Sequence, residues 1–83
     1  MSWTLDWSRV AERDMLNIPW KLAARVDAAL MAFAADRDHE GTVQRMVATD
    51  PYRLRLRLPG ASALLWIEPG TRVVNVSRVL RAT

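Results

Sequence analysis

The sequence contains no cysteine and only one histidine among its 83 residues. The absence of cysteine excludes disulfide bonds and thiolate metal sites. The histidine, His39, lies in the acidic run Asp-Arg-Asp-His-Glu, whose adjacent side chains cannot all face one ion. We therefore interpret this run as a solvated helix end or loop, and we expect neither a metal site nor a cofactor.

Long apolar runs are also absent, because no segment reaches the roughly 18 residues that a membrane-spanning helix needs. The N-terminal segment Met-Ser-Trp-Thr-Leu-Asp lacks the basic and then apolar plan of a signal peptide. We expect a cytoplasmic protein without a membrane partner. The length predicts a single domain over residues 1–83, small enough that its core must be efficient or must be helped by a partner.

Lysine is scarce, since arginine supplies all but one of the twelve basic residues. The charge is also uneven. Residues 1–40 carry five bases and seven acids, whereas residues 41–83 carry seven arginines and only two acids. The positive field therefore belongs to the second half, where we expect a polyanion to bind.

The run Tyr-Arg-Leu-Arg-Leu-Arg-Leu over residues 52–58 is the most informative segment. Its period of two predicts a strand with three leucines on one face, headed by Tyr52, and with Arg53, Arg55 and Arg57 on the other. Successive arginines would stand roughly 6.5–7 Å apart, close to the phosphate repeat of a stretched nucleic-acid strand. An alternative remains, because arginines on an edge strand also prevent pairing with other chains and their stems cover apolar neighbours.

The first half predicts a short strand followed by two helices. Trp3, Leu5 and Trp7 alternate with polar residues, which indicates an opening strand with one apolar face. Ser8 can cap a helix that Pro19 ends, and the same proline can open a second helix whose apolar residues recur at helical spacing to Phe33. Residues 37–50 show no sustained period, and we expect a loop or irregular turn there.

The last third predicts three strands joined by two turns. Residues 59–62 turn the chain into the apolar run 63–67, which is typical of a central strand covered on both faces. Residues 68–71 favour a type II turn, and the final strand over 73–80 has an ambiguous facing that a bulge would resolve. The fold class is therefore α+β: an N-terminal strand, a two-helix hairpin, and then a three-stranded antiparallel meander.

This order of elements resembles the RelE/ParE superfamily of toxins from type II toxin–antitoxin systems. The resemblance covers nearly the whole chain. It rests on the opening strand 3–7, the Ile18-Pro19 helix end, the Ala-Phe-Ala-Ala segment at 32–35, the Tyr-Arg-Leu-Arg segment at 52–55, and the closing strand 74–79.

The resemblance implies functional residues by position. Members that cut messenger RNA in the ribosomal A site use basic residues on the strand after the helices, and Arg53 and Arg55 match these. An arginine on the return strand falls near Ala63, which has no charge. After the last strand, where those members carry a basic residue and a tyrosine, Arg81 is the only candidate. Arg57 and Arg78 are conjectured substitutes, so Arg81 and Arg57 are the catalytic candidates, and Arg53, Arg55, Arg57 and Arg78 the RNA-binding ones.

Three functions stay open under this resemblance. The first is ribosome-dependent mRNA cleavage, a metal-independent attack by the 2′-hydroxyl that inhibits translation. The second is a toxin directed at DNA gyrase, whose relatives lack the nuclease residues, and the third is a catalytically silent member that binds only its antitoxin or DNA. A small α+β domain of unrelated role is the remaining possibility. Four tryptophans and 51% apolar residues predict an exposed apolar patch, which an acidic cognate antitoxin would cover.

Overall fold

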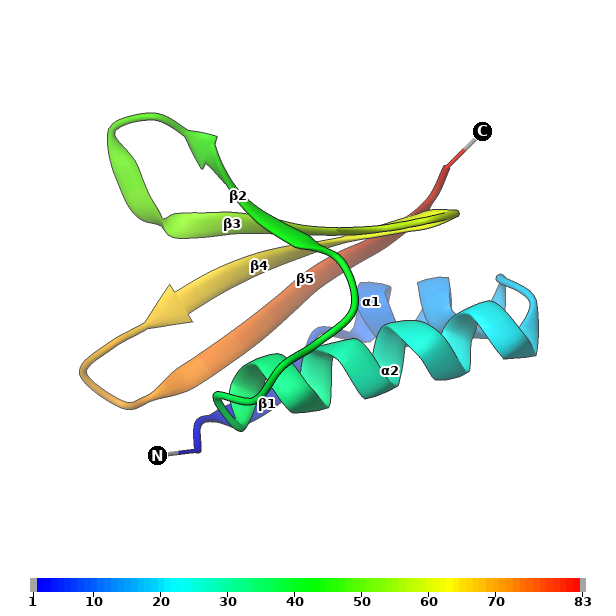
Figure 1. Cartoon of the computed structure of the whole chain (residues 1–83), viewed down its shortest axis with the longest axis horizontal. Coiled ribbons are helices and arrows are strands. Elements are labelled where there is room, and N and C mark those ends of the chain that lie inside the picture. The colour runs from blue at the N-terminus through cyan, green and yellow to red at the C-terminus, as the bar shows by residue number, and fades with distance from the viewer. Residues whose placement is uncertain (1, 83) are drawn as a thin grey trace.

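The computed structural model describes residues 2–82, which form two helices and five strands (Figure 1). In chain order the elements are β1 (Thr4–Trp7), α1 (Arg9–Leu16), α2 (Trp20–Ala34), β2 (Thr42–Val47), β3 (Asp50–Leu58), β4 (Ala61–Glu68) and β5 (Val73–Arg81). The predicted α+β class, with an opening strand and a two-helix hairpin, is confirmed. The sheet contains one strand more than expected.

All five strands belong to one mixed sheet in the order β1-β5-β4-β3-β2. Strands β2 to β5 form an antiparallel meander, so the meander has four strands instead of the predicted three. Strand β1 pairs with β5 in parallel, with Thr4 opposite Val73 and Trp7 opposite Val76. The helical hairpin therefore carries the chain from one edge of the sheet to the other.

The expected loop over residues 37–50 was wrong for the segment that forms β2. This strand lies at the edge of the sheet, and Val43 alone of its six residues is half-buried, the others being exposed. An exposed edge strand has no buried face to impose an alternating pattern, which explains why its sequence gave no period. The strand forms because β3 supplies backbone partners, with Val43 opposite Leu56.

Ser8 joins β1, α1 and the outer edge of β5. Its side chain accepts a hydrogen bond from the Ala11 amide, as predicted for a helix cap, and its Oγ donates to the Ser77 carbonyl at 2.8 Å. Its backbone N–H donates to the Val76 carbonyl. Helix α1 ends at Leu16, and Pro19 is the N-cap of α2, one residue before the position expected.

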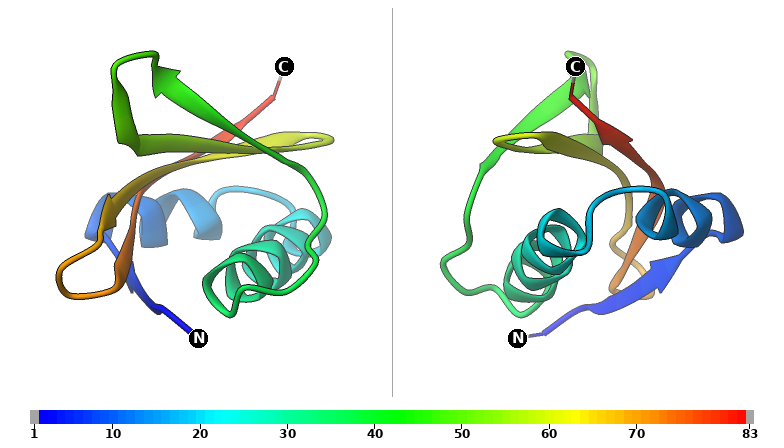
Figure 2. Two further views of the ribbon diagram at one scale, coloured as in Figure 1. Left: turned by 60° about the vertical axis from the view of Figure 1, so that its left-hand side comes forward. Right: turned by 90° about the vertical axis from the view of Figure 1, so that its right-hand side faces the viewer.

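Both helices lie on the same side of the sheet, and the core fills the space between (Figure 2). The most deeply buried large side chains are Leu30, Leu56, Val26, Val74 and Val76. Alanines on the sheet, among them Ala61 and Ala63, let the helices approach closely. No described helix covers the opposite side of the sheet, and that side is called the open face below.

Strand β4 was expected to be covered on both faces, and this was wrong. Ala61, Ala63 and Leu65 are buried, whereas Trp66 is 39% exposed. The reason is that the fold has a single helical layer, so the alternate residues of even a central strand face outward.

The bulge considered for the final strand is present. The register of β4 against β5 shifts between Leu64 and Leu65, so Leu64 faces Arg78 while Leu65 faces Val76. Ser77 is the extra residue, and because of it Val76 and Val79 both reach the core. The bulge therefore decides which side chains of β5 face the core, which the sequence alone left ambiguous.

Gly41 and Arg72 take left-handed backbone conformations, which favour glycine. Gly41 has φ +92°, and a Cβ atom there would lie 2.5 Å from the Arg57 carbonyl oxygen. The predicted type II turn at residues 68–71 was wrong, because Gly70 does not take the positive φ that this turn requires. The connection runs over four residues instead, and Arg72 takes the left-handed conformation with φ 56°.

Candidate nucleic-acid interface

The alternating run of β3 places its leucines and arginines on opposite sides of the sheet, as predicted. Leu56 and Leu58 are buried against the helical layer and Leu54 is half-buried there. Arg53, Arg55 and Arg57 consequently share the open face. Their side chains leave the strand roughly 6.5–7 Å apart. These three side chains and their cross-strand neighbours on β2 and β4 are called the arginine face.

Arg53 is held at one end of the arginine face by two contacts. Its Nε lies 3.4 Å from the Asp50 carboxylate, which also accepts a hydrogen bond from the Tyr52 amide. Its guanidinium carbon lies 4.4 Å from the centroid of the Trp66 ring, directly across on β4. Both contacts are at the surface, since the Arg53 side chain is 52% exposed, so they orient the guanidinium without fixing it tightly.

Arg55 occupies the middle of the face, between Gln44 on β2 and Leu64 on β4. Its Nε is buried and has no hydrogen-bond partner within residues 2–82. A cavity of about 150 Å³ opens beside it, lined by Gln44, Arg45, Met46 and Arg55. A buried donor without an acceptor is unfavourable, so this position would be stabilised by an anion or another acceptor.

Arg57 lies at the opposite end of the arginine face from Arg53. It is exposed, and its cross-strand neighbours Thr42 and Ser62 are both neutral. The structure records no ion pair for it in the described part of the chain. Its guanidinium is therefore available to a phosphate group.

Arg78 is opposite Leu64 and thus two strands away from Arg55, but its guanidinium is engaged by Asp14 of α1. Its Nε donates to Asp14 Oδ2 at 2.8 Å and its second guanidinium nitrogen to Oδ1 at 3.2 Å. The same carboxylate accepts from the Val79 amide at 2.9 Å, so Asp14 fastens α1 to the edge of β5. The hydrogen bond from Arg78 lowers the pKa of Asp14, and the pair raises the pKa of Arg78.

The remaining sequence candidates lie away from the three arginines. Arg81 is opposite Ala61, whose side chain is buried on the helical side, so the strand register places Arg81 on that side at the rim. Ala63 is 1% exposed and faces the core, which leaves no room for a charged side chain there. Tyr52 shares the leucine side and is exposed beyond the helices.

Two members of the arginine face, Trp66 and Gln44, were not predicted from the sequence. Trp66 was assigned to a doubly covered strand, although the small residues at 61 and 63 were a sign that only one side of β4 packs tightly. Gln44 was missed because β2 itself was missed. Both become visible only when the strands are paired.

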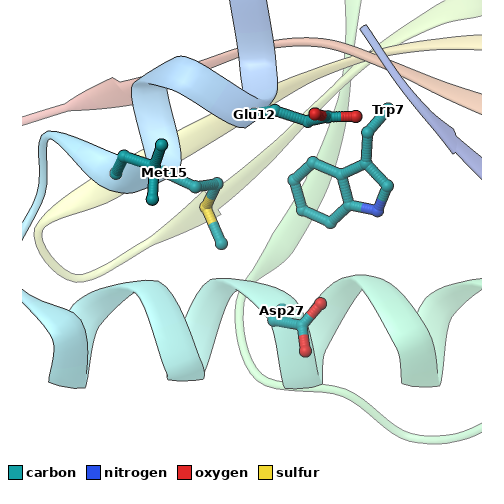
Figure 3. Close-up of a pocket in the computed structure, with 5 residues that line it drawn as sticks. Trp7, Glu12, Met15 and Asp27 are labelled. Carbon is teal, nitrogen blue, oxygen red and sulfur yellow. The ribbon is translucent and has the colours of Figure 1, made fainter. Parts of the chain in front are cut away.

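A second cavity, of about 420 Å³, lies in the helical half of the molecule (Figure 3). It is lined by Trp7, Glu12, Met15, Leu16 and Asp27. The figure shows the carboxylates of Glu12 and Asp27 on opposite sides of the Trp7 indole. The cavity is open and mostly apolar, and it does not adjoin the arginine face.

Other kinds of site find little support in the described chain. Between residues 2 and 82 there is no group of three or more side chains of the metal-binding types. His39 packs edge-on against Phe33, with ring centroids 5.6 Å apart. Neither helix combines the length and apolar character needed to cross a membrane.

Comparisons with known proteins identify the fold. No protein-family model matches the sequence, and no curated protein matches it. Among solved structures, a chain of the RelBE2 toxin–antitoxin complex from Mycobacterium tuberculosis matches with a TM-score of 0.80 and 15% identity, covering 99% of this chain and 93% of that one. A chain of the RelB–RelE antitoxin–toxin complex from Methanococcus jannaschii matches with a TM-score of 0.71 and 13% identity, covering 92% and 88%. The predicted resemblance in fold is confirmed.

Proposed function

We propose that this chain is the toxin component of a type II toxin–antitoxin pair and that it inhibits translation by cutting messenger RNA on the ribosome. The observation that carries the proposal is the set of three arginines sharing the uncovered side of the sheet. The fold similarity to chains of two toxin–antitoxin complexes supports the system class. A row of cations with no helix above it suits an extended single strand of RNA.

The proposed reaction is an in-line attack of a ribose 2′-hydroxyl on the adjacent phosphate. Arg53 and Arg55 hold the RNA backbone, and Arg57, exposed between neutral neighbours, stabilises the charge that builds on the phosphate oxygens. Arg78 is held by Asp14 until RNA competes for it, and Arg81 faces the helical side at the rim, away from this phosphate. The ribosome orients the strand, since the arginines alone recognise phosphate without selecting a sequence.

One observation favours a second candidate, a toxin that does not cut RNA. Thr42 and Ser62 flank Arg57 across the sheet, and neither is a general acid or base near neutral pH. A chain without such a group can still block a target by binding it. Gyrase inhibition and a silent role limited to antitoxin or DNA binding are the two forms of this candidate.

An acidic antitoxin is the proposed partner under each of these functions. Its carboxylates would neutralise the arginine face, and its apolar residues would cover exposed side chains such as Leu16, Trp20 and Met31. Micromolar or weaker binding to the product of the adjacent gene would argue against this partner.

The first test compares wild type with Arg53→Ala/Arg55→Ala/Arg57→Ala by primer extension on ribosomes carrying a defined message. We expect A-site cuts with wild type and none with the triple variant. In a binding assay with single-stranded RNA, the variant should also lower the salt slope by about 2, from three lost phosphate contacts.

Two matched variants serve as controls for this test. Arg9→Ala/Arg13→Ala/Arg37→Ala removes the same charge from outside the arginine face and should still cut. Arg53→Lys/Arg55→Lys/Arg57→Lys keeps the charge and should retain RNA binding.

Ribosome binding with intact message would exclude the nuclease, and a supercoiling assay would then test the gyrase alternative. The silent role is excluded if expression without antitoxin arrests growth.

A further inference from the structure

Trp66 is the one aromatic residue that the described strands place on the arginine face. It is 39% exposed and lies directly across the sheet from Arg53. Its flanking residues on β4, Leu65 and Ile67, point to the helical side and are packed against the core. An exposed indole beside cations, on a strand inside the sheet, has the composition of surfaces that bind single-stranded nucleic acid.

We propose that the Trp66 indole is a stacking platform for one base of single-stranded RNA, an inference that rests on the function proposed above. Single-stranded RNA is the chosen ligand because its bases are free to leave their neighbours and stack on a side chain, whereas duplex bases are not. The platform adds to the site an element that recognises a base, while the arginines recognise phosphate.

Arg53 controls access to the Trp66 indole. Its guanidinium carbon lies 4.4 Å from the ring centroid and thus occupies a face of the indole in the absence of RNA. The contacts that hold it there are exposed, and Asp50 is 3.4 Å away, so a phosphate can draw the guanidinium off the ring. One nucleotide then gains both a stacked base on Trp66 and a paired phosphate on Arg53.

Arg55 gives independent support for an acceptor elsewhere on the arginine face. Its buried Nε lacks a partner among residues 2–82, and the cavity of about 150 Å³ beside it is bounded by the Gln44 side chain. A phosphate oxygen in this cavity would satisfy the donor. Arg55 is opposite Leu64, and Trp66 is the next residue of β4 on that face, so the proposed base site and the cavity share the open face, with the cavity on the β2 side of Arg55.

The experiment measures binding of two labelled probes to the full chain. One is an RNA oligonucleotide of about six nucleotides, and the other is an abasic oligonucleotide of equal length with the same phosphates. We expect wild type to bind the RNA about tenfold more tightly than the abasic probe, because only the RNA can stack. Trp66→Ala should abolish this preference.

Trp66→Leu, which keeps an apolar side chain, should abolish the preference as well and covers the case in which the alanine variant fails to fold. Trp66→Phe should keep most of it. Trp20→Ala is the matched control, because Trp20 is 75% exposed and also lies beneath a cation, with Lys21 Nζ 5.7 Å from its ring, but it belongs to the helical layer. This control should leave the preference unchanged.

Two other results would overturn the inference in distinguishable ways. Equal binding of both probes by wild type would remove the stacking platform while leaving the arginine face as an RNA site. Binding of neither probe would instead remove the proposed function and this inference together. An unchanged preference in the folded Trp66→Leu variant would assign the stacking to another residue.

Discussion

The two faces of the sheet differ in the polarity and the pairing of their side chains. The buried side chains on the helical side are all apolar, and no polar or charged residue is buried within the described chain. The open face carries cations in three different states: Arg53 is paired and stacked, and among residues 2–82 Arg55 has a buried donor without a partner and Arg57 has no recorded ion pair. Stability should therefore depend mainly on one face and the proposed RNA binding on the other.

Leu56→Ala tests the helical face and should have the largest effect on stability. Leu56 is 0% exposed at the centre of β3, so the substitution removes buried apolar surface and leaves a cavity. We expect a loss of about 2–5 kcal/mol in the free energy of unfolding. Urea unfolding followed by tryptophan fluorescence measures it.

Arg57→Ala, at the next position of the same strand, is the matched control. It points to the open face and no ion pair is recorded for it among residues 2–82, so its urea midpoint should equal that of wild type within error, while the proposed RNA binding weakens. A loss of stability comparable to that of Leu56→Ala would contradict the separation of the two faces.

Much of the fold was predictable because local pattern and tertiary structure agree. The Arg/Leu alternation predicted which side chains of β3 face the core and which form the arginine face. Ser8 and Pro19 predicted the helix boundaries to within one or two residues. Strand β2 was not predictable, because its exposed residues carry no pattern and its existence depends on pairing with β3. Edge strands of this kind are specified by their neighbour.

The candidate site was predictable only in part, for a related reason. Arg53, Arg55 and Arg57 follow from a period of two within one strand. The neighbours that decide their states come from other strands: Trp66 across from Arg53, and Gln44 beside Arg55. The partner of Arg78 is 64 residues away in sequence, which no local pattern reveals.

Asp14→Asn tests the link between the two faces, because Asp14 binds an arginine from the open side and a backbone amide at the edge of β5. The Asp14 side chain is 16% exposed, so water screens its ion pair with Arg78 only in part. We expect a loss of about 1–2 kcal/mol at neutral pH, smaller than for Leu56→Ala. The same urea titration measures it.

The pH dependence of this effect has a definite sign. Arg78 holds the pKa of Asp14 below its ordinary value of 3.8, so the unfolded chain binds the proton more tightly than the folded protein. The contribution of Asp14 is complete above about pH 4 and is lost as the pH falls through the lower folded value. The difference between wild type and Asp14→Asn should shrink over that interval, and a constant difference would show that charge is not its source.

Glu40→Gln should have the smallest effect, although it too removes a carboxylate bonded to an arginine. Glu40 pairs with Arg25, but the two side chains are 44% and 45% exposed and connect a loop to the outer surface of α2. The pair lowers the pKa of Glu40 chiefly through the hydrogen bond from Arg25, yet water screens it at this exposure. We expect a urea midpoint equal to wild type at low and at high salt. A loss as large as that of Asp14→Asn would mean that the position of Asp14 between the two faces contributes nothing beyond an ordinary surface pair.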